Sequence, residues 1–369
     1  MCAAWLQMNG RLNVAVIEGN GRVGAKLKVS GGGKCNITNV DVRPAHYLGD
    51  EAMLKRVLNH FSKEKLLGFL KQHGVDPVVR KGRYYFCRDS SDEIIDLLRR
   101  LGKRSDYRLG RQIKRVVKEE DAFIVTTDKE HVKAQQVVVA TGGISFKTLG
   151  ATGVGLEIAN SFGHSVTPFT PALVGLTLQP SQFWMKELSG ISFPVRIVSG
   201  GRVIEEDMLF AHKGISGPAV LSASLYWHKG SITVDFLPGK SVDALCTGSK
   251  KLVSSAIPLP KRFMKQFLQV AEIEDKSCTR LSSSEMQRLL QLHAYEFAPS
   301  GSFGFTKAEV SRGGVMSDEI DAATMQSRRC EGLYFIGEVV DMTGELGGYN
   351  FQWAFSSAVT AGDDLLKRY

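Results

Sequence analysis

The 369-residue sequence has no apolar run near the roughly 18–20 residues that a membrane-spanning helix needs. Residues 1–8 lack both a positively charged start and a cleavage-site pattern, so no signal peptide is expected. None of the six cysteines forms a C-x-x-C pair, which leaves no signal for a zinc site or a dithiol motif. Widely spaced cysteines in a chain of this size are typical of reduced thiols. We therefore expect a cytoplasmic protein with no metal site.

Positive charge is in moderate excess, because the sequence has 47 Lys and Arg residues and 38 Asp and Glu residues, which gives a net charge of +9. Such an excess is compatible with a polyanionic partner, although a merely basic surface is the commoner explanation. If the chain binds nucleic acid, two basic runs are candidates for phosphate contacts. They are Arg99, Arg100, Lys103, Arg104, Arg108, Arg111, Lys114, Arg115 and Lys118, and then Lys250, Lys251, Lys261, Arg262 and Lys265.

Glycine is abundant, with 38 residues, and it clusters. The most unusual cluster lies in residues 30–39, where Gly31, Gly32 and Gly33 follow one another. Three consecutive glycines expose backbone N–H groups, as an anion or the edge of a flavin requires. Short polar side chains follow at Asn36 and in residues 38–39, which makes a merely flexible loop the weaker interpretation.

An acidic residue ends the first predicted strand, over residues 13–18, which reads as a fully buried parallel strand. In a dinucleotide-binding fold, an acid at the position of Glu18 accepts hydrogen bonds from an adenosine ribose. A simple strand-end charge is the alternative. The order of the motifs is more informative: Glu18, the glycine loop, antiparallel strands over residues 111–139, then Thr141, Gly142 and Gly143 after a buried strand.

A second glycine cluster lies far along the chain, in residues 337–354. It opens with Gly337, Glu338 and Asp341, and Asp341 is placed to accept from ribityl hydroxyls. Gly347 and Gly348 would let a helix N-terminus press against a flavin pyrimidine, where the helix dipole stabilises negative charge. A glycine cap and turn is the weaker interpretation. We expect this cluster and the loop at 30–39 to converge on one ring system.

The remaining pattern predicts helices and a domain insertion. Helices are expected over residues 2–9, over 50–74 with a cap at Ser62, and from a capping box at Ser90 and Glu93 to Gly102. After residue 171 the sequence pattern predicts short antiparallel strands and then a helical stretch. Buried strands over 137–139 and 333–336 flank this change, which indicates one discontinuous domain with an insertion.

One expected element is missing. A dinucleotide fold needs a strand and a G-x-G-x-x-G turn ahead of its first helix, to place the pyrophosphate at the helix N-terminus. Here the chain starts inside that helix, so we expect the strand and turn to lie upstream of Met1 in a longer form. The prediction is that this 369-residue form is unstable or poor in cofactor.

At these residues the sequence resembles the bacterial family of aminoacetone-oxidase-like NAD(P)/FAD-dependent oxidoreductases, which includes the flavin-dependent ribosomal-RNA dihydrouridine synthase. Two departures stand out: the N-terminal glycine motif is absent, and Val154 stands where the family often has an acid. The matching stretches cover nearly the whole chain and are residues 24–39, 140–155, 212–218, 310–315, 324–327 and 332–362.

The resemblance implies an α/β fold with a glutathione-reductase-like FAD-binding domain over residues 1–170 and 306–369. It further implies an inserted β-barrel-like domain over 171–238 and 297–305 and a helical subdomain over 239–296. FAD is the implied cofactor and a reduced nicotinamide, NAD(P)H, the implied electron donor. The preferred substrate is a uridine in large-subunit ribosomal RNA, reduced to dihydrouridine after the base is flipped or looped out. The alternatives are a flavin-dependent oxidoreductase of a small molecule, such as an amine or an unsaturated ring, and a non-catalytic flavin- or RNA-binding protein.

Reduction of a uracil ring needs a proton donor as well as a hydride, and Cys35, with Asn36 beside it, is the candidate. A buried structural thiol is the commoner fate of a cysteine. The turn over residues 212–218 is equally open to two interpretations, a cover over the substrate or a domain hinge. The expected cofactor-binding residues are Glu18, Lys26, Gly31, Gly32, Gly33, Asn36, Thr141, Gly142, Gly143, Gly337, Glu338, Asp341, Gly347, Gly348, Tyr349 and Asn350.

Overall fold

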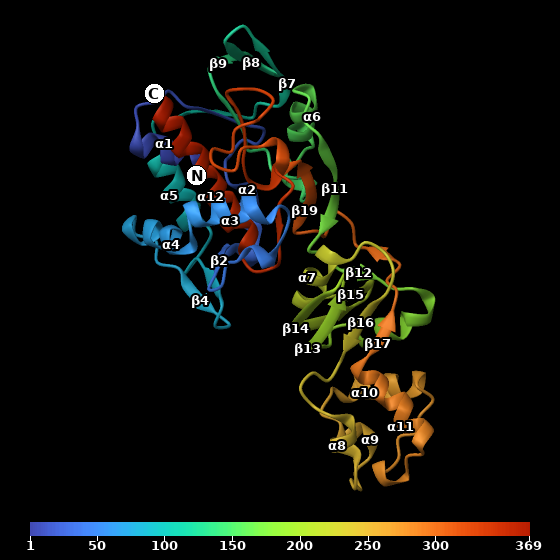
Figure 1. Ribbon diagram of the computed structural model, residues 1–369. Coiled ribbons are helices and arrows are strands. Elements are labelled where there is room, and N and C mark those ends of the chain that lie inside the picture. Colours follow the sequence, from blue (N-terminus) through green and yellow to red (C-terminus); the bar gives the residue numbers. More distant parts are fainter. The chain divides into compact units, whose positions relative to one another are not determined.

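A computed structural model describes residues 1–369 and divides the chain into two compact units (Figure 1). The first unit comprises Met1–Thr170 and Val310–Tyr369, and the second comprises Pro171–Glu309. The first unit is therefore discontinuous in sequence. None of the helices combines the length and the apolar character needed to cross a membrane.

Four parallel strands form the base of the first unit, in two separate pairs. β1 (Ala15–Glu18) pairs with β6 (Asp106–Leu109), and β10 (Val137–Val139) pairs with β20 (Leu333–Phe335). The strands predicted over residues 13–18, 137–139 and 333–336 are confirmed as β1, β10 and β20. The prediction that β1 is fully buried is wrong: Ala15 is exposed and the rest of the strand is only half-buried, because β1 pairs with β6 alone.

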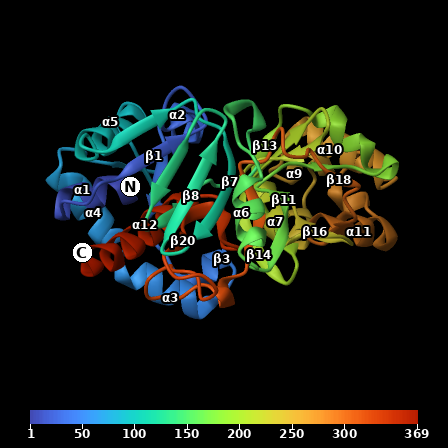
Figure 2. The same cartoon turned by 90° about the horizontal axis from the view of Figure 1, so that it is seen from above.

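An antiparallel meander lies between these parallel pairs in sequence, as predicted. It consists of β7 (Ile113–Glu119), β8 (Ala122–Thr127) and β9 (His131–Ala134), in that order (Figure 2). From Phe123 onward, the residues of β8 alternate between buried and half-buried, so one face of the meander packs inward. The meander returns the chain to β10 and to the residues that follow it.

Helices of the first unit begin where the sequence places their caps. Asp50 accepts a hydrogen bond from Met53 N at the start of α3 (Glu51–His60), and Ser62 caps α4 (Lys63–Gln72). At the start of α5 (Asp92–Leu101), Glu93 accepts from Ser90 N at 3.2 Å, while Ser90 Oγ accepts from Asp92 N. The predicted capping residues are therefore in place, with the helix beginning one residue later than a strict capping box.

The long C-terminal helix α12 (Tyr349–Arg368) forms the centre of the first unit's core. It packs against α1 (Cys2–Asn9) and α3 (Figure 1), and Trp353 is almost wholly buried in it. The unit's other elements are α2 (Ala25–Val29), η1 (Ser30–Gly33), β2 (Asn36–Asn39), η2 (Pro44–His46), β3 (Tyr47–Leu48), β4 (Val78–Arg80), β5 (Tyr84–Phe86), η3 (Lys147–Leu149), α6 (Val154–Ser161), β11 (Val166–Ala172), β19 (Val310–Val315), η7 (Ser317–Glu319), η8 (Gly337–Val339) and β21 (Thr343–Gly344).

The second unit is built on one seven-stranded sheet with the order β17-β16-β13-β14-β15-β12-β18. Its spine is the hairpin of β13 (Ser192–Ser199) and β14 (Arg202–Ala211), and β17 and β18 are the two edges. Aromatic rings around Phe263 form its core. The other elements are β12 (Leu176–Thr177), η4 (Pro180–Leu188), β15 (Gly214–Ser216), α7 (Pro218–Tyr226), β16 (Ile232–Asp235), α8 (Val242–Cys246), α9 (Val253–Ala256), α10 (Lys261–Val270), η5 (Cys278–Arg280), α11 (Ser283–Leu289), η6 (Leu290–His293), β17 (Tyr295–Phe297) and β18 (Gly301–Ser302).

Candidate active site

The triple glycine forms a tight left-handed turn between α2 and β2. Gly31, Gly32 and Gly33 have φ values of 56°, 65° and 84°, which side chains other than glycine adopt only with strain. A Cβ on Gly32 would meet no atom within 4 Å, so its backbone faces open space. The carbonyl of Gly33 accepts a hydrogen bond from Ser91 N at 2.9 Å, which fixes the turn against the start of α5. The turn is thus held at one end and open at its middle.

The segment after this turn meets the second glycine cluster directly, as predicted. Thr38 Oγ1 donates to Gln352 Oε1 at 2.6 Å, and both side chains are fully buried. Asn39 Nδ2 donates to the carbonyl of Gly347 at 3.0 Å. A Cβ on Gly348 would lie 2.7 Å from Thr38 N, so only glycine allows the two backbones to approach this closely. Residues more than 300 positions apart therefore form one wall.

Gly348 also caps α12, with φ at 89°, so the helix begins at this wall. Tyr349, the first helical residue, stacks on the ring of His46 with 4.8 Å between ring centroids, and burial raises the pKa of its hydroxyl. Asn350 turns away from the helix end: it accepts from Gly344 N and donates to Gly344 O, each at 2.8 Å. The side chain of Asn350 therefore braces the preceding loop.

A third segment joins this wall through Ser311. The hydroxyl Oγ of Ser311 accepts from the backbone N–H groups of Ile144 and Ser145 at 2.9 and 3.0 Å. The backbone N–H of Ser311 donates to Glu338 Oε1 at 2.8 Å. A Cβ on Gly143 would lie 2.5 Å from Ser311 Oγ and 2.8 Å from Glu338 Oε1, so the glycine is required for this packing.

An ion pair closes the arrangement across α2. Lys26 Nζ donates to Glu338 Oε2, and the side chain of Glu338 is only 16% exposed. Gly337 is fixed to α12 by two bonds: its N–H donates to Ser357 Oγ at 3.0 Å and its carbonyl accepts from Trp353 Nε1 at 2.9 Å. Lys26, Gly337 and Glu338 thus join α2, η8 and α12.

These segments leave polar groups and backbone without partners inside the chain. The hydroxyl oxygens of Thr141 and Thr343 are buried and have no hydrogen-bond partner. Gly142 has a φ of 69° and, like Gly32, would place a Cβ in open space. The Thr141 hydroxyl lies against Gly155, where an added Cβ would overlap with it. The open backbone at Gly32 and Gly142 is the feature that a flat, polar-edged ring with a phosphate tail would use. The residues present therefore fit a flavin nucleotide.

Glu18 lies at the carboxyl end of β1, apart from this wall. Its Oε1 accepts from Asn20 N at 2.9 Å, and its carbonyl accepts from Arg111 N at 3.0 Å. Asn20 Nδ2 donates in turn to the carbonyl of Leu149 at 3.0 Å, which ties this end to the segment after Gly143. No hydrogen bond joins Glu18 itself to the loop at 30–39 or to the cluster at 337–354.

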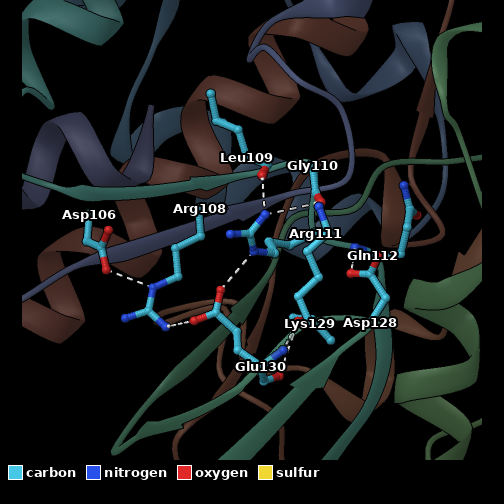
Figure 3. A network of polar contacts seen from close by, with 10 residues as sticks. Asp106, Arg108, Leu109, Gly110, Arg111, Gln112, Asp128, Lys129 and Glu130 are labelled. Carbon is cyan, nitrogen blue, oxygen red and sulfur yellow. Dashed lines mark hydrogen bonds and ion pairs between the residues drawn. The ribbon is translucent and has the colours of Figure 1, made fainter.

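A network of charged side chains supports the loop beside Glu18 (Figure 3). Glu130 accepts from Arg108 Nη1 at 2.7 Å and from Arg111 Nε at 2.9 Å, and Arg108 Nε donates to Asp106 at 2.7 Å. Gln112 donates from Nε2 to the carbonyl of Gly19 at 3.0 Å. Arg108 and Arg111 are therefore engaged within the chain and hold the loop at 109–112 against the turn that contains Glu130, while Gln112 ties the loop to Gly19.

The candidate proton donor Cys35 is fully buried, as is Cys87 next to it. The backbone N–H of Cys87 donates to the carbonyls of Lys34 and Cys35 at 3.0 and 3.3 Å. A hydrogen bond from the Cys87 thiol lowers the pKa of Cys35 and raises that of Cys87. Both thiols belong to a buried apolar cluster with Ile37, Leu66 and Ile94, so the Cys35 thiol is not open to a substrate in this conformation. The catalytic roles of Cys35 and of Asn36, the first residue of β2, stay predictions.

Arg312 lies close enough to Asp341 to feel its charge, which the sequence did not reveal. Burial lowers the pKa of Arg312, and the negative charge of Asp341 opposes that shift. The backbone N–H of Asp341 donates to Val315 O at 3.0 Å. Ser311 and Gln352 were missed as well. The sequence did contain a signal for Ser311 and Arg312, because the glycine pair Gly313 and Gly314 comes directly after them. This pair packs on residues 167–168 and 339–341.

The turn at 212–218 lies in the second unit. Residues Gly214–Ser216 form β15, Gly217 caps α7 with φ at 86°, and Pro218 is the first residue of that helix. A tight turn that opens a helix is therefore present. Its role as a cover or as a hinge stays a prediction.

Comparison with known proteins agrees with this geometry. The family profile described as "HI0933-like protein Rossmann domain" matches residues 1–364. The chain is 35% identical over 379 residues to the ribosomal RNA dihydrouridine synthase of Escherichia coli (strain K12), covering 99% of this chain and 94% of that protein. It is 28% identical over 381 residues to a 3-dehydro-bile acid delta(4,6)-reductase of Clostridium scindens, covering 96% and 93%. Among solved structures, a mutated quinol fumarate reductase of E. coli matches with a TM-score of 0.50 at 12% identity, covering all of this chain and 68% of that one, a likeness of fold alone.

The fold and the converging glycine segments define a flavin-dependent oxidoreductase with a Rossmann-like FAD-binding domain. More narrowly, the chain belongs to the HI0933-like family. The predicted family resemblance, fold class and enzyme class are confirmed.

Proposed function

We propose that this protein reduces a uridine in large-subunit ribosomal RNA to dihydrouridine. The observation that carries the proposal is the nearly full-length match, at 35% identity, to a ribosomal RNA dihydrouridine synthase. The match spans the glycine turn, the segment around Thr141 and the start of α12, so it includes every part of the candidate site. The excess of positive charge agrees with an RNA substrate without requiring one.

The reaction adds two hydrogen atoms across one carbon–carbon double bond of the uracil ring. Bound FAD supplies a hydride to one of the two carbons, and we propose NAD(P)H as the source of that hydride. The other carbon receives a proton from an acid of the protein or from water. The base must leave its stack to reach the site, because a ring inside a helix presents no face to a flavin.

The chain's own residues hold the reactants. Gly32 and Gly142 offer open backbone to the flavin. The start of α12 at Gly348 presents the positive end of a 20-residue helix, which favours negative charge on a ring placed there. We propose that Asp341 accepts hydrogen bonds from ribityl hydroxyls. Cys35 remains our candidate for the proton donor.

A second candidate function is reduction of a small unsaturated ring. The specific observation in its favour is the 28% identity to a bile acid reductase over 96% of this chain. The two functions differ in their dependence on salt. Binding of RNA through phosphates weakens steeply as salt rises, whereas binding of a small neutral ring does not.

The test is mass spectrometry of nucleosides from ribosomal RNA of a strain that lacks the gene. We expect one dihydrouridine of the large-subunit RNA to disappear and to return when the gene is supplied on a plasmid. Survival of every dihydrouridine in the deletion strain would overturn the proposal. A Cys35→Ser chain in the same complementation tests the proton donor, with Cys278→Ser as its control because that thiol is also buried but lies in the second unit.

A further inference from the structure

A cavity of the first unit lies outside the candidate active site. It has a volume of about 740 Å³ and lies between the loop that leads into α2, helix α5 and the end of β6. Five of its lining residues are basic and two are acidic. The basic residues are Arg22, Lys28, Arg99, Arg100 and Lys103, and the acidic ones are Asp92 and Asp96.

The charges in this cavity are only partly neutralised. Lys28 Nζ pairs with Asp92, which leaves Asp96 as the one carboxylate for four cations. Arg100 Nη2 donates to the carbonyl of His73 at 2.8 Å, a contact that fixes the guanidinium without cancelling its charge. The cavity therefore keeps an excess of three positive charges, which focuses a positive potential in a concave surface.

The neighbouring cations of the same basic run are engaged elsewhere. Arg104 Nη2 donates to the carbonyl of Gly10 at 3.1 Å, and Arg108 and Arg111 bind Glu130. Lys118 Nζ donates to the carbonyl of Glu331 at 2.8 Å. Phosphate binding by these four would break contacts within the chain. Of the basic run at 99–118, Arg99, Arg100 and Lys103 line the cavity, whereas Lys114 and Arg115 are exposed on β7 outside it.

The cavity leads toward the predicted cofactor end of the first unit. A smaller hollow of about 330 Å³ shares Gly21, Arg22 and Ala25 with it and is bounded on its other side by Asn20 and Leu149. Asn20 is the residue whose N–H donates to Glu18. An extended anion in the cavity would therefore continue toward the acid at the end of β1.

The character of the cations favours a polymer over a buried nucleotide. Arg22, Lys28, Arg99, Arg100 and Lys103 are all exposed, and they come from both walls of the cavity. Small-ligand sites bury most of their ligand, whereas exposed, mobile cations suit a phosphate backbone that stays in contact with solvent. Arg99 and Arg100 lie in the last turn of α5, and Lys103 lies in the turn that follows Gly102, so the three cations gather at the C-terminal end of this helix.

We propose that this basic groove, lined by Arg22, Lys28, Arg99, Arg100 and Lys103, holds the phosphate backbone of the RNA that carries the target base. The proposal rests on the proposed function, since it names the surface by which the same RNA substrate is bound. It assigns to the first unit alone a contact with several phosphates.

The experiment compares two triple variants of the full chain. The groove variant carries Arg99→Gln, Arg100→Gln and Lys103→Gln, and the control carries Lys55→Gln, Arg56→Gln and Lys229→Gln, which removes equal charge from exposed positions outside both basic runs. Anisotropy of a fluorescein-labelled single-stranded RNA of about 20 nucleotides is measured from about 50 to 300 mM NaCl. Both variants are first shown to melt at the wild-type temperature.

We expect the groove variant to bind this RNA at least tenfold more weakly at about 100 mM salt. Its slope of log affinity against log salt should be smaller by about two, since each single-strand phosphate contact contributes roughly 0.7. The control variant should bind within about twofold of the wild type. Equal weakening of both variants, unchanged binding by the groove variant, or no RNA binding by the wild type would overturn the proposal.

A competing occupant is the phosphate end of a nicotinamide dinucleotide, and the same proteins test it. If 2′,5′-ADP displaces the labelled RNA from the wild type, and the groove variant has lost that competition, the groove is a dinucleotide site and the proposal is wrong. Failure of the proposed function looks different. In that case the deletion strain keeps its dihydrouridines while the groove variant still loses its affinity for RNA.

Discussion

Lys26 and Glu338 lie 312 positions apart in sequence and form an ion pair at the candidate site. The sequence placed both among the cofactor-binding residues but gave no sign that they pair, because a contact between distant segments leaves no periodic pattern. The same reason explains why Ser311, which binds the backbone of residues 144 and 145, was missed. Residue types and glycine positions could be predicted locally, whereas partners across the site could not.

Substituting Lys26 by Met should weaken FAD binding. Loss of the ammonium leaves the half-buried carboxylate of Glu338 without its cation and frees the wall between α2 and η8. We expect the Kd for FAD to rise about tenfold, which corresponds to roughly 1.4 kcal/mol, in a titration followed by flavin fluorescence. Lys28→Met is the matched control, since Lys28 lies on the same short helix but pairs with Asp92. Equal losses of FAD affinity in the two variants would contradict the assignment.

Glu319 should make stability depend on acid pH. A hydrogen bond from Arg329 lowers the pKa of Glu319 to about 2, and Ser165 N also donates to this carboxylate at 2.8 Å. Because the folded-state pKa lies below the ordinary pKa of 4.5 for a glutamate, the stabilisation is complete above about pH 4.5 and is lost as the pH falls toward 2. In urea unfolding, Glu319→Gln should remove on the order of 1 kcal/mol of that pH dependence, and Glu119→Gln, at an exposed position, should leave it unchanged. Parallel pH profiles of Glu319→Gln and the wild type would refute this.

At the scale of elements, the close approach of β2 and α12 decides the shape of the site. The positive φ of Gly348 and its contact with Thr38 both require glycine. The sequence predicted this convergence because each cluster contains glycines followed by short polar residues. It did not predict that Asn350 braces Gly344, since an amide can serve a ligand or the chain equally well.

Gly348→Ala should therefore cost more stability than left-handed strain alone. Gly74 provides the control, because its φ of 85° is nearly the same while a Cβ there would meet no atom within 4 Å. We expect Gly74→Ala to lower the free energy of unfolding by about 1 kcal/mol and Gly348→Ala by about 3 kcal/mol, measured by denaturant titration. Equal costs would show that β2 and α12 do not pack as described.

Local patterns were sufficient for helix caps and for most strands of the first unit, but not for the exposure of strands. The apolar run at 13–18 has the composition of a buried strand, and yet β1 has one pairing partner and half-exposed side chains. Exposure depends on which strands lie on either side, and this information is absent from the strand's own residues. An unpaired strand edge such as that of β1 also favours self-association with another copy of the chain.

At the scale of the whole molecule, each of the two units has its own core. We therefore expect two unfolding transitions instead of one. The four tryptophans report on them separately, since Trp5 and Trp353 lie in the first unit and Trp184 and Trp227 in the second. In guanidinium titrations, a chain with Trp184→Phe and Trp227→Phe should follow the first unit alone by fluorescence. A single midpoint shared by this chain, the wild type and circular dichroism would contradict independent cores.

Amide hydrogen exchange, measured by mass spectrometry with and without saturating FAD, tests most directly whether the distant glycine segments form one flavin site. The account predicts slower exchange on FAD addition in peptides that cover residues 30–39, 141–143 and 337–348. Flavin fluorescence in the same samples reports that FAD is bound. Bound FAD with unchanged exchange in these three segments, or with protection confined to other peptides, would contradict it.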